Sequence, residues 1–164
     1  MKREESGFTL IELLIVIAII GILASISIPN LLNAVSRGRQ KKTMADMRTL
    51  ATALEAYAVD DNHYPSASCP SAAFTAEGSA LTSASFTSLV PTYISQLPGK
   101  GGTDGWNHPL YYNLATSRTS YNIRSRGRDN SAQASLTCGT TTNFNDDIVY
   151  SNGSFIQWPE GMQR

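Results

Sequence analysis

The sequence predicts an α+β protein in which one long N-terminal α-helix packs on a small antiparallel β-sheet. Three observations lead to this prediction. Residues 8–28 are almost wholly apolar, an amphipathic stripe continues over residues 44–58, and short runs of alternating polarity with aromatic residues occupy residues 110–158. A chain of 164 residues has room for one spanning helix and one modest domain, so we expect a single domain after the helix.

The first element is the apolar segment of residues 8–28. A helix that spans a bilayer needs about 20 apolar residues, and this segment reaches that length with one charge, Glu12. A carboxylate in hydrocarbon costs about 3 kcal/mol or more, so such a residue is by default a functional candidate. We therefore expect Glu12 to have a partner.

The stretch before this segment is short and charged, and it ends in Gly7. A secretory signal carries its small-residue cleavage site after the apolar region, whereas here Pro29 and Asn30 follow. Cleavage after Gly7 would keep the apolar helix and leave a free amine on Phe8, close in sequence to Glu12. Pairing of the two charges would offset the cost of burying either one.

Residues 7–12, Gly-Phe-Thr-Leu-Ile-Glu, followed by the apolar run, resemble the class III prepilin signature of type IV pilins and type II secretion pseudopilins. The resemblance implies a pilin-like fold, cleavage by a prepilin peptidase after Gly7 and N-methylation of Phe8. It also implies that Glu12 pairs with the Phe8 amine of a neighbouring subunit in a homopolymeric filament. The alternative is a plain membrane anchor with a stray Glu12.

The resemblance also implies an organisation and a location. Residues 1–7 form a cleaved leader, residues 8–29 a transmembrane and filament-core helix, and residues 30–164 an exported globular head. The subunit crosses the bacterial inner membrane once, with its N-terminus cytoplasmic and its head periplasmic, until an inner-membrane assembly platform adds it to a periplasmic or cell-surface filament.

A basic cluster follows the apolar segment and consists of Arg37, Arg39, Lys41 and Lys42. The positive-inside rule alone would keep this flank in the cytoplasm. We retain the orientation of the resembled family, because the leader also carries Lys2 and Arg3. We interpret the cluster as a solvated or inter-subunit helix face; the alternative is contact with acidic lipid or DNA. The 13 basic and 13 acidic residues balance, so we expect no nucleic-acid partner.

The helix is predicted to continue beyond Pro29. Proline removes one helical hydrogen bond and usually kinks a helix. In the resembled family it bends or locally melts the helix without ending it. Beyond it, apolar residues recur at spacings of three and four, typical of one buried helix face: Met44, Met47, Leu50, Ala51, Leu54, Tyr57 and Ala58. The run Asp60-Asp-Asn-His-Tyr-Pro65 predicts the end of the helix near Asp60.

The rest of the chain is predicted to be loops and strands. Residues 66–88, rich in Ser, Ala and Thr, are expected to form a loop, with a short helix around residues 85–90. The alternation favours antiparallel strands with one face on the helix, at residues 110–114, 120–125, 147–150 and 154–158. Ser151-Asn152-Gly153 predicts a tight hairpin turn between the last two.

Two stretches of the head resemble the G-type major pseudopilin, namely residues 97–112 and the pair of segments 121–129 and 145–148. The second resemblance implies a calcium site formed by Asp129, Asp146, Asp147 and the backbone carbonyl of Arg126, since calcium takes six to eight oxygen ligands. The alternative is a loop without metal, in which these aspartates pair with nearby arginines, Arg124, Arg126 and Arg128. We expect no other cofactor.

The chain has two cysteines, Cys69 and Cys138, both in polar surroundings. An exported compartment would let them form one disulfide, and the alternative is two unrelated thiols. Closing a loop of about 70 residues would stabilise the fold by about 4 kcal/mol in the chain-entropy treatment.

No residue constellation supports catalysis, so we expect a protein that is not an enzyme. The resemblance implies a structural subunit, most like a major pseudopilin of type II protein secretion that acts with an outer-membrane secretin complex. One alternative is a type IV major pilin for adhesion, twitching motility or DNA uptake. Another is a minor tip pilin that acts as a binding module, although the presence of Glu12 favours a subunit of the main shaft.

Overall fold

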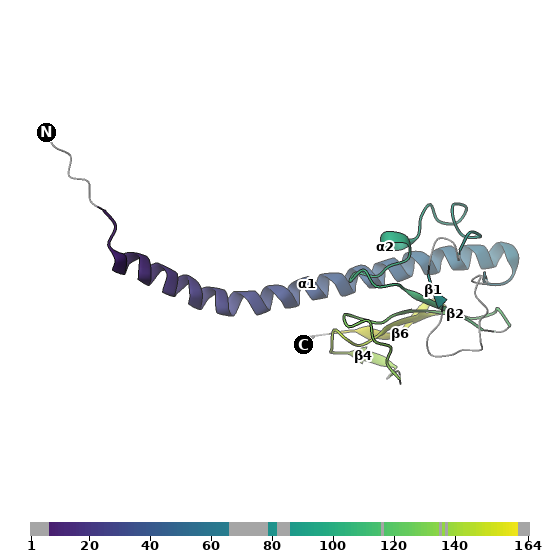
Figure 1. Ribbon diagram of the computed structural model, residues 1–164. Helices are drawn as coiled ribbons and strands as arrows, with labels where there is room; N and C mark the ends of the chain where they lie inside the picture. The colour runs from purple at the N-terminus through teal and green to yellow at the C-terminus, as the bar shows by residue number, and fades with distance from the viewer. Residues whose placement is uncertain are drawn as a thin grey trace. The chain divides into compact units, whose positions relative to one another are not determined.

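The computed structural model describes residues 7–65, 79–81, 86–115, 117–134, 136 and 138–160. The chain forms two compact units, Met1–Val35 and Ser36–Arg164. Helix α1, Leu10–Asp61, belongs to both (Figure 1). The predicted long helix is confirmed, and it runs through Pro29 as an uninterrupted element.

The end of α1 follows the predicted turn chemistry. Asn62 adopts a left-handed conformation with φ 57°, the conformation that commonly terminates helices and that Asn tolerates well. The His63 Nδ1 atom lies 2.6 Å from the carbonyl oxygen of Asp61, one of the last helical carbonyls. Local side chains therefore end the helix within one residue of the predicted position.

The described residues contain six strands in one sheet, in the order β1-β2-β3-β5-β6-β4. Every neighbouring pair is antiparallel except β4 and β6, which are parallel. The four predicted strands are confirmed, whereas β1 and β4 lie in Ser/Thr-rich stretches with no strand signal. The strands are β1 Ser79–Ala80, β2 Tyr111–Leu114, β3 Tyr121–Ser125, β4 Gly139–Thr141, β5 Ile148–Ser151 and β6 Ser154–Pro159.

A tight hairpin joins β5 to β6, as predicted. Asn152 and Gly153 have φ angles of 45° and 89°, and positive φ at both central residues suits the twist of the flanking strands. The Asn152 side chain also accepts a hydrogen bond from the Tyr121 amide at 3.0 Å. The turn is thereby tied to the neighbouring strand β3.

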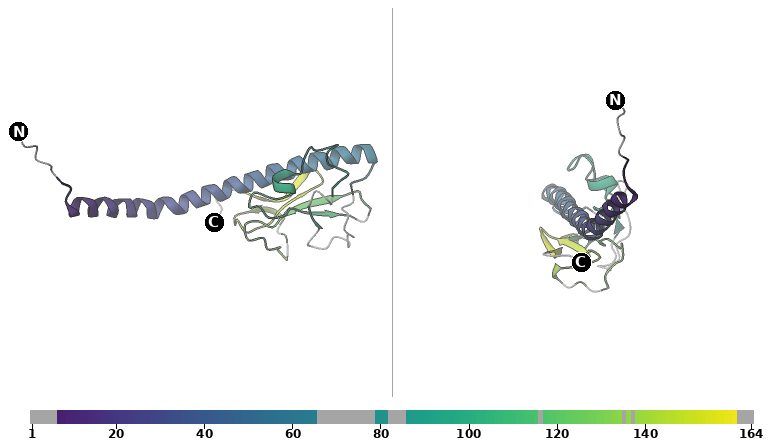
Figure 2. Two further views of the ribbon diagram at one scale, coloured as in Figure 1. Left: turned by 45° about the horizontal axis from the view of Figure 1, so that its top comes forward. Right: turned by 90° about the vertical axis from the view of Figure 1, so that its left-hand side faces the viewer.

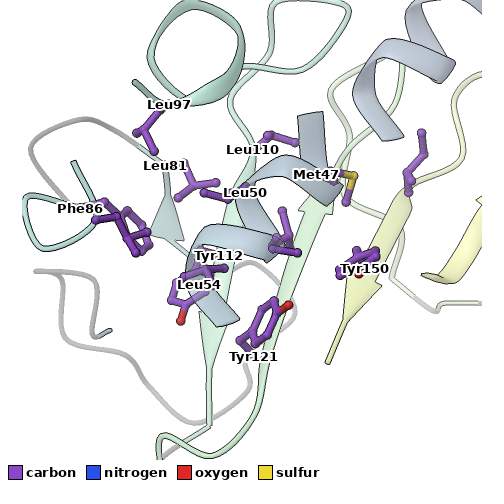
Figure 3. Packing of buried hydrophobic residues seen from close by; sticks show 14 of the residues in the cluster. Met47, Leu50, Leu54, Leu81, Phe86, Leu97, Leu110, Tyr112, Tyr121 and Tyr150 are labelled. Atoms are coloured by element: carbon purple, nitrogen blue, oxygen red, sulfur yellow. The ribbon is translucent and has the colours of Figure 1, made fainter. Parts of the chain in front are cut away.

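The core of the second unit lies between the C-terminal half of α1 and the sheet (Figures 2 and 3). The predicted apolar face of the helix is confirmed, because Met47, Leu50 and Leu54 are fully buried while Thr49 and Thr52 on the other side of the helix are exposed. The sheet contributes Tyr112, Leu114, Tyr121, Ile123, Ile148 and Tyr150 to the core, and the loops contribute Leu81, Phe86, Leu89, Leu97, Trp106, Leu110 and Phe144.

The segment between β1 and β2 departs from the prediction. Residues 86–93 form successive turns in place of the short helix expected around residues 85–90. The element α2, Pro98–Gly101, is a single distorted turn with non-helical angles at Gly99 and Lys100. Leu89 and Leu97 anchor this segment in the core, and backbone hydrogen bonds from the Val90 amide to Phe86 and from the Tyr93 amide to Leu89 hold its turns.

A buried aspartate organises the turn before β2. Asp104 is 2 % exposed, and its Oδ1 atom accepts hydrogen bonds from the backbone amides of Trp106 and His108, both at 2.9 Å. Its Oδ2 atom accepts a hydrogen bond from the Ser125 hydroxyl at 2.7 Å. Asp104 thus joins this turn to the end of β3.

The same turn packs directly on α1. The Gly105 amide donates to the Thr43 hydroxyl at 2.9 Å, and a Cβ atom at Gly105 would lie 2.2 Å from the carbonyl oxygen of Arg39. Only glycine therefore fits this position without a backbone shift.

Candidate functional site

The first candidate site is the start of α1. Thr9 and Glu12 form a capping box: the Thr9 amide donates to Glu12 Oε2 at 2.8 Å, and the Glu12 amide donates to Thr9 Oγ1 at 3.3 Å. The Thr9 hydroxyl donates to the same Oε2 atom at 2.7 Å. The Glu12 carboxylate is therefore folded back over the helix start, beside the residue that follows Phe8 in the chain.

Sequence reasoning singled out Glu12 and missed Thr9. The signal was present, because Thr followed three residues later by Glu before an apolar run is the pattern of a capping box. The capping box shows how the chain satisfies part of the Glu12 carboxylate in a single subunit. Both hydrogen bonds go to Oε2, so Oε1 is available to a second donor.

The apolar side chains that follow Glu12 are exposed in the isolated chain. From Leu10 to Leu32, the large aliphatic residues of α1 expose half or more of their surface, and Phe8 is 89 % exposed. The helix is long and apolar enough to cross a membrane by its length and composition. A continuous apolar surface of this size requires lipid or another protein around it.

The basic cluster lies just beyond this apolar surface. Arg39, Lys41 and Lys42 are exposed on α1, whereas Gln40 and Thr43 between and beside them are buried in the second unit. These three basic residues are therefore accessible to solvent in the isolated chain, whereas Arg37 of the same cluster is half-buried.

The second candidate site is the loop predicted to bind calcium. Asp129 and Asp146 are engaged in hydrogen bonds, with Asp129 Oδ1 accepting from the Ser131 amide at 3.0 Å and Asp146 Oδ1 accepting from Gln133 Nε2 at 3.0 Å. Within the described ranges, His, Cys, Asp and Glu side chains form no group of three or more that could hold a metal ion. Asp129, Asp146 and Asp147 therefore do not form such a group.

Asp147 is the buried member of this set. It forms an ion pair with Arg124, and the two side chains are 0 % and 4 % exposed. Burial raises the pKa of the Asp147 carboxyl above its ordinary value, and the charge and hydrogen bonds of Arg124 act in the opposite direction. Asp147 Oδ1 is buried and accepts no hydrogen bond within the described part of the chain, so it is one oxygen that a cation or a water could use.

These donors do not fit a calcium ion. Calcium needs six to eight oxygens, whereas the described acidic side chains form no group of three that could hold it, and Asp147 is already paired with a buried guanidinium. Of the three nearby arginines, Arg124 takes the predicted role of pairing with an aspartate. Arg126 instead lies over the Tyr111 ring at 3.8 Å, and Arg128 donates to Asn145 Oδ1 at 3.0 Å.

The predicted disulfide stays a prediction. Cys138 is an exposed free thiol next to β4, and Cys69 lies outside the described residues.

Comparison with known proteins gives two family matches. The family described as type II secretion system (T2SS), protein G, matches residues 30–143, and the prokaryotic N-terminal methylation motif matches residues 2–28. Together they cover the segment that contains Gly7, Phe8 and Glu12 and the head as far as residue 143. No solved structure is similar enough to count as a match.

Individual relatives point the same way. The chain is similar to type II secretion system core protein G of Aeromonas hydrophila, with 47% identity over 39% of this chain and 45% of the relative. It is similar to the protein of that name from Escherichia coli (strain K12), with 42% identity over 38% of this chain and 43% of the relative. The chain thus spans less than half the length of these two relatives. The Pseudomonas aeruginosa core protein G is 29% identical over 78% of this chain and 87% of the relative.

Proposed function

Because the chain belongs to the type II secretion system protein G family, we propose that it is the structural subunit of a pseudopilus and polymerises through residues 8–29. The observation that carries the proposal is the exposed apolar half of α1 with one carboxylate at its start. Among the residues of its own unit that the structure describes, that half has no apolar partner, so a filament of neighbouring helices is the environment that suits it. The family is structural, and the alternatives of a type IV pilin or a tip adhesin are not favoured by these matches.

The first step of the proposed function is processing. A prepilin peptidase removes residues 1–7 after Gly7, and the new amine of Phe8 is N-methylated, in keeping with the match to the methylation motif over residues 2–28. Before assembly the helix of residues 8–29 anchors the subunit in the inner membrane, with the head of residues 30–164 in the periplasm. An assembly platform then transfers the subunit into the filament, which acts with a secretin complex.

The second step is pairing between subunits. In the free subunit, Thr9 satisfies one oxygen of the Glu12 carboxylate. In the filament, the Phe8 amine of a neighbour binds the remaining oxygen, and the two charges compensate each other in apolar surroundings. The pairing sets the axial register, since Glu12 is the only charge between residues 8 and 28.

A comparison of Glu12→Ala with Glu160→Ala tests this function. Both changes remove one carboxylate, but Glu160 is exposed on the head after β6. We expect Glu12→Ala to abolish or greatly reduce filaments in sheared fractions and electron micrographs, with membrane insertion and head folding unchanged. The Glu160→Ala protein should assemble like the wild type. A normal filament yield from Glu12→Ala would refute the pairing.

A further inference from the structure

The long connection between β3 and β4 is tied to the start of β5 by one residue, Gln133. Its backbone amide donates to Asp147 Oδ2 at 3.2 Å, and its side-chain Nε2 donates to Asp146 Oδ1 at 3.0 Å. Its side-chain oxygen accepts from the Asp147 amide at 3.1 Å and from Gln157 Nε2 at 2.6 Å. The backbone and the side chain of Gln133 are thus held by the two residues before β5 and by Gln157 of β6.

Arg124 completes this network from strand β3. Its Nε and Nη2 atoms both reach Asp147 Oδ2, and Nη2 also donates to the backbone carbonyl of Gln133 at 2.7 Å. One buried guanidinium therefore bridges a carboxylate before β5 and a carbonyl in the β3–β4 connection. These two kinds of oxygen, from two separate segments, are what a calcium ion would gather in a loop of this type.

The beginning of the same connection contacts the turn before β5 through backbone atoms. Gly127 has φ 64°, and a Cβ atom there would lie 2.8 Å from the carbonyl oxygens of Asn145 and Asp146. The Arg128 amide donates to the Phe144 carbonyl at 2.9 Å. Backbone contacts therefore hold the beginning of the connection in place, and the hydrogen bonds of Arg124 and Gln133 hold its middle.

A divalent ion and the Arg124 guanidinium would compete for the same oxygen atoms. Arg124 already neutralises the buried Asp147, and two like charges a few ångströms apart in a poorly solvated site repel strongly. Arginine also offers directed donors that match carboxylate and carbonyl oxygens, which a spherical ion does not. The local charge is therefore balanced without an added cation.

We propose that the Arg124 guanidinium is the resident cation of this loop, and that it makes the order of residues 126–134 and the stability of the head independent of calcium. The proposal concerns the head of the subunit and does not depend on how the filament assembles. It replaces a ligand that must be captured from the surroundings by a charge built into β3.

The first test uses the wild-type full chain in detergent micelles. Its thermal unfolding is followed by tryptophan fluorescence in EGTA and in millimolar calcium, together with hydrogen exchange of residues 126–134. We expect the same Tm and the same exchange rates, within about twofold, in both conditions. A Tm higher by several degrees in calcium, with slower exchange in this loop, would overturn the proposal, because ligand binding to the native state alone raises its stability.

The second test compares Arg124→Gln with Arg128→Gln, two changes that each remove one positive charge, the first in β3 and the second in the connection after it. Arg124→Gln leaves Asp147 buried without its cation, so we expect the Tm in EGTA to fall by about 10 °C or more. Arg128 is exposed, and its loss should lower the Tm by about 3 °C or less. Equal effects of the two changes would contradict the assignment.

A double variant keeps the test decisive if Arg124→Gln fails to fold. Arg124→Gln combined with Asp147→Asn removes both charges and retains groups that can form hydrogen bonds. If the guanidinium is needed to compensate Asp147, the double variant should be more stable than Arg124→Gln alone. A double variant that is less stable than Arg124→Gln, or equally unfolded, would contradict the proposal.

Discussion

Replacing Asp104 tests whether a buried acceptor holds the turn before β2. In the Asp104→Ala protein, the amides of Trp106 and His108 and the hydroxyl of Ser125 each lose their acceptor. An unsatisfied buried polar group costs about 1–3 kcal/mol, so we expect a total loss of about 3–5 kcal/mol in the free energy of unfolding. The whole free energy of unfolding of a typical domain is roughly 5–15 kcal/mol, so this loss would be a large part of it.

Asp104→Asn separates hydrogen bonding from charge. The amide oxygen of asparagine can still accept from the two backbone amides, and its NH₂ group can donate to Ser125 once that hydroxyl turns to accept. We expect a loss of about 1 kcal/mol or less for this variant. Asp60→Ala is the control, because its exposed carboxylate accepts one hydrogen bond, from the Tyr93 hydroxyl at 2.8 Å, and should cost about 0.5 kcal/mol.

Urea unfolding of the full chain in detergent, followed by tryptophan fluorescence, measures all three variants. Both tryptophans, Trp106 and Trp158, lie in the head, so the signal reports on that unit. A loss below about 1 kcal/mol for Asp104→Ala would refute the acceptor argument, since each orphaned donor alone should cost that much. An equal loss for Asp104→Asn would show that the charge, and not the acceptor geometry, matters.

Two further predictions concern α1. Gly105→Ala should destabilise the head by about 1–3 kcal/mol in the same urea assay, because the new Cβ atom would lie 2.2 Å from the Arg39 carbonyl oxygen. Gly38→Ala is the control. A Cβ atom at Gly38 would have nothing within 4 Å, so this change should stabilise the helix by up to about 1 kcal/mol. Burial raises the pKa of Asp46 above its ordinary value, so the folded state holds this proton more tightly and stability falls as pH rises from the ordinary pKa through the raised one. Asp46→Asn should therefore be more stable than the wild type at pH 7, by only about 0.5 kcal/mol because the carboxyl group is partly solvated. This advantage should vanish near pH 3, where the wild-type carboxyl group is protonated. An advantage that persists at low pH would contradict the raised pKa of Asp46.

The parts of the fold that were predictable share a local signal. The spacing of Met47, Leu50 and Leu54 marks a helix face, and the alternation along β2, β3, β5 and β6 marks half-buried strands, because each pattern follows the period of its own element. Strand β4 escaped prediction because Gly-Thr-Thr carries no apolar alternation. It is held by its parallel pairing with β6, a contact that only the folded chain provides.

The candidate sites divide in the same way. Glu12 stood out because a single charge interrupts an apolar run, and the proposed filament role rests on that contrast. At the loop, the sequence placed Asp147 beside both a calcium motif and a set of arginines, and could not decide between them. The decision depends on strand register: β3 pairs with β5 so that Ser125 lies opposite Ile148, which brings Arg124 and Asp147 together.

The edge strands of the sheet affect how neighbouring heads can associate. Within the described residues, the two outermost strands are also the two shortest, β1 with 2 residues and β4 with 3. A long exposed edge invites pairing with the edge of another molecule, and a short one offers few backbone groups for it. Heads concentrated along a fibre would meet edge to edge many times without forming continuous sheets. Self-association would then be confined to the apolar helices, with no continuous sheet running from head to head.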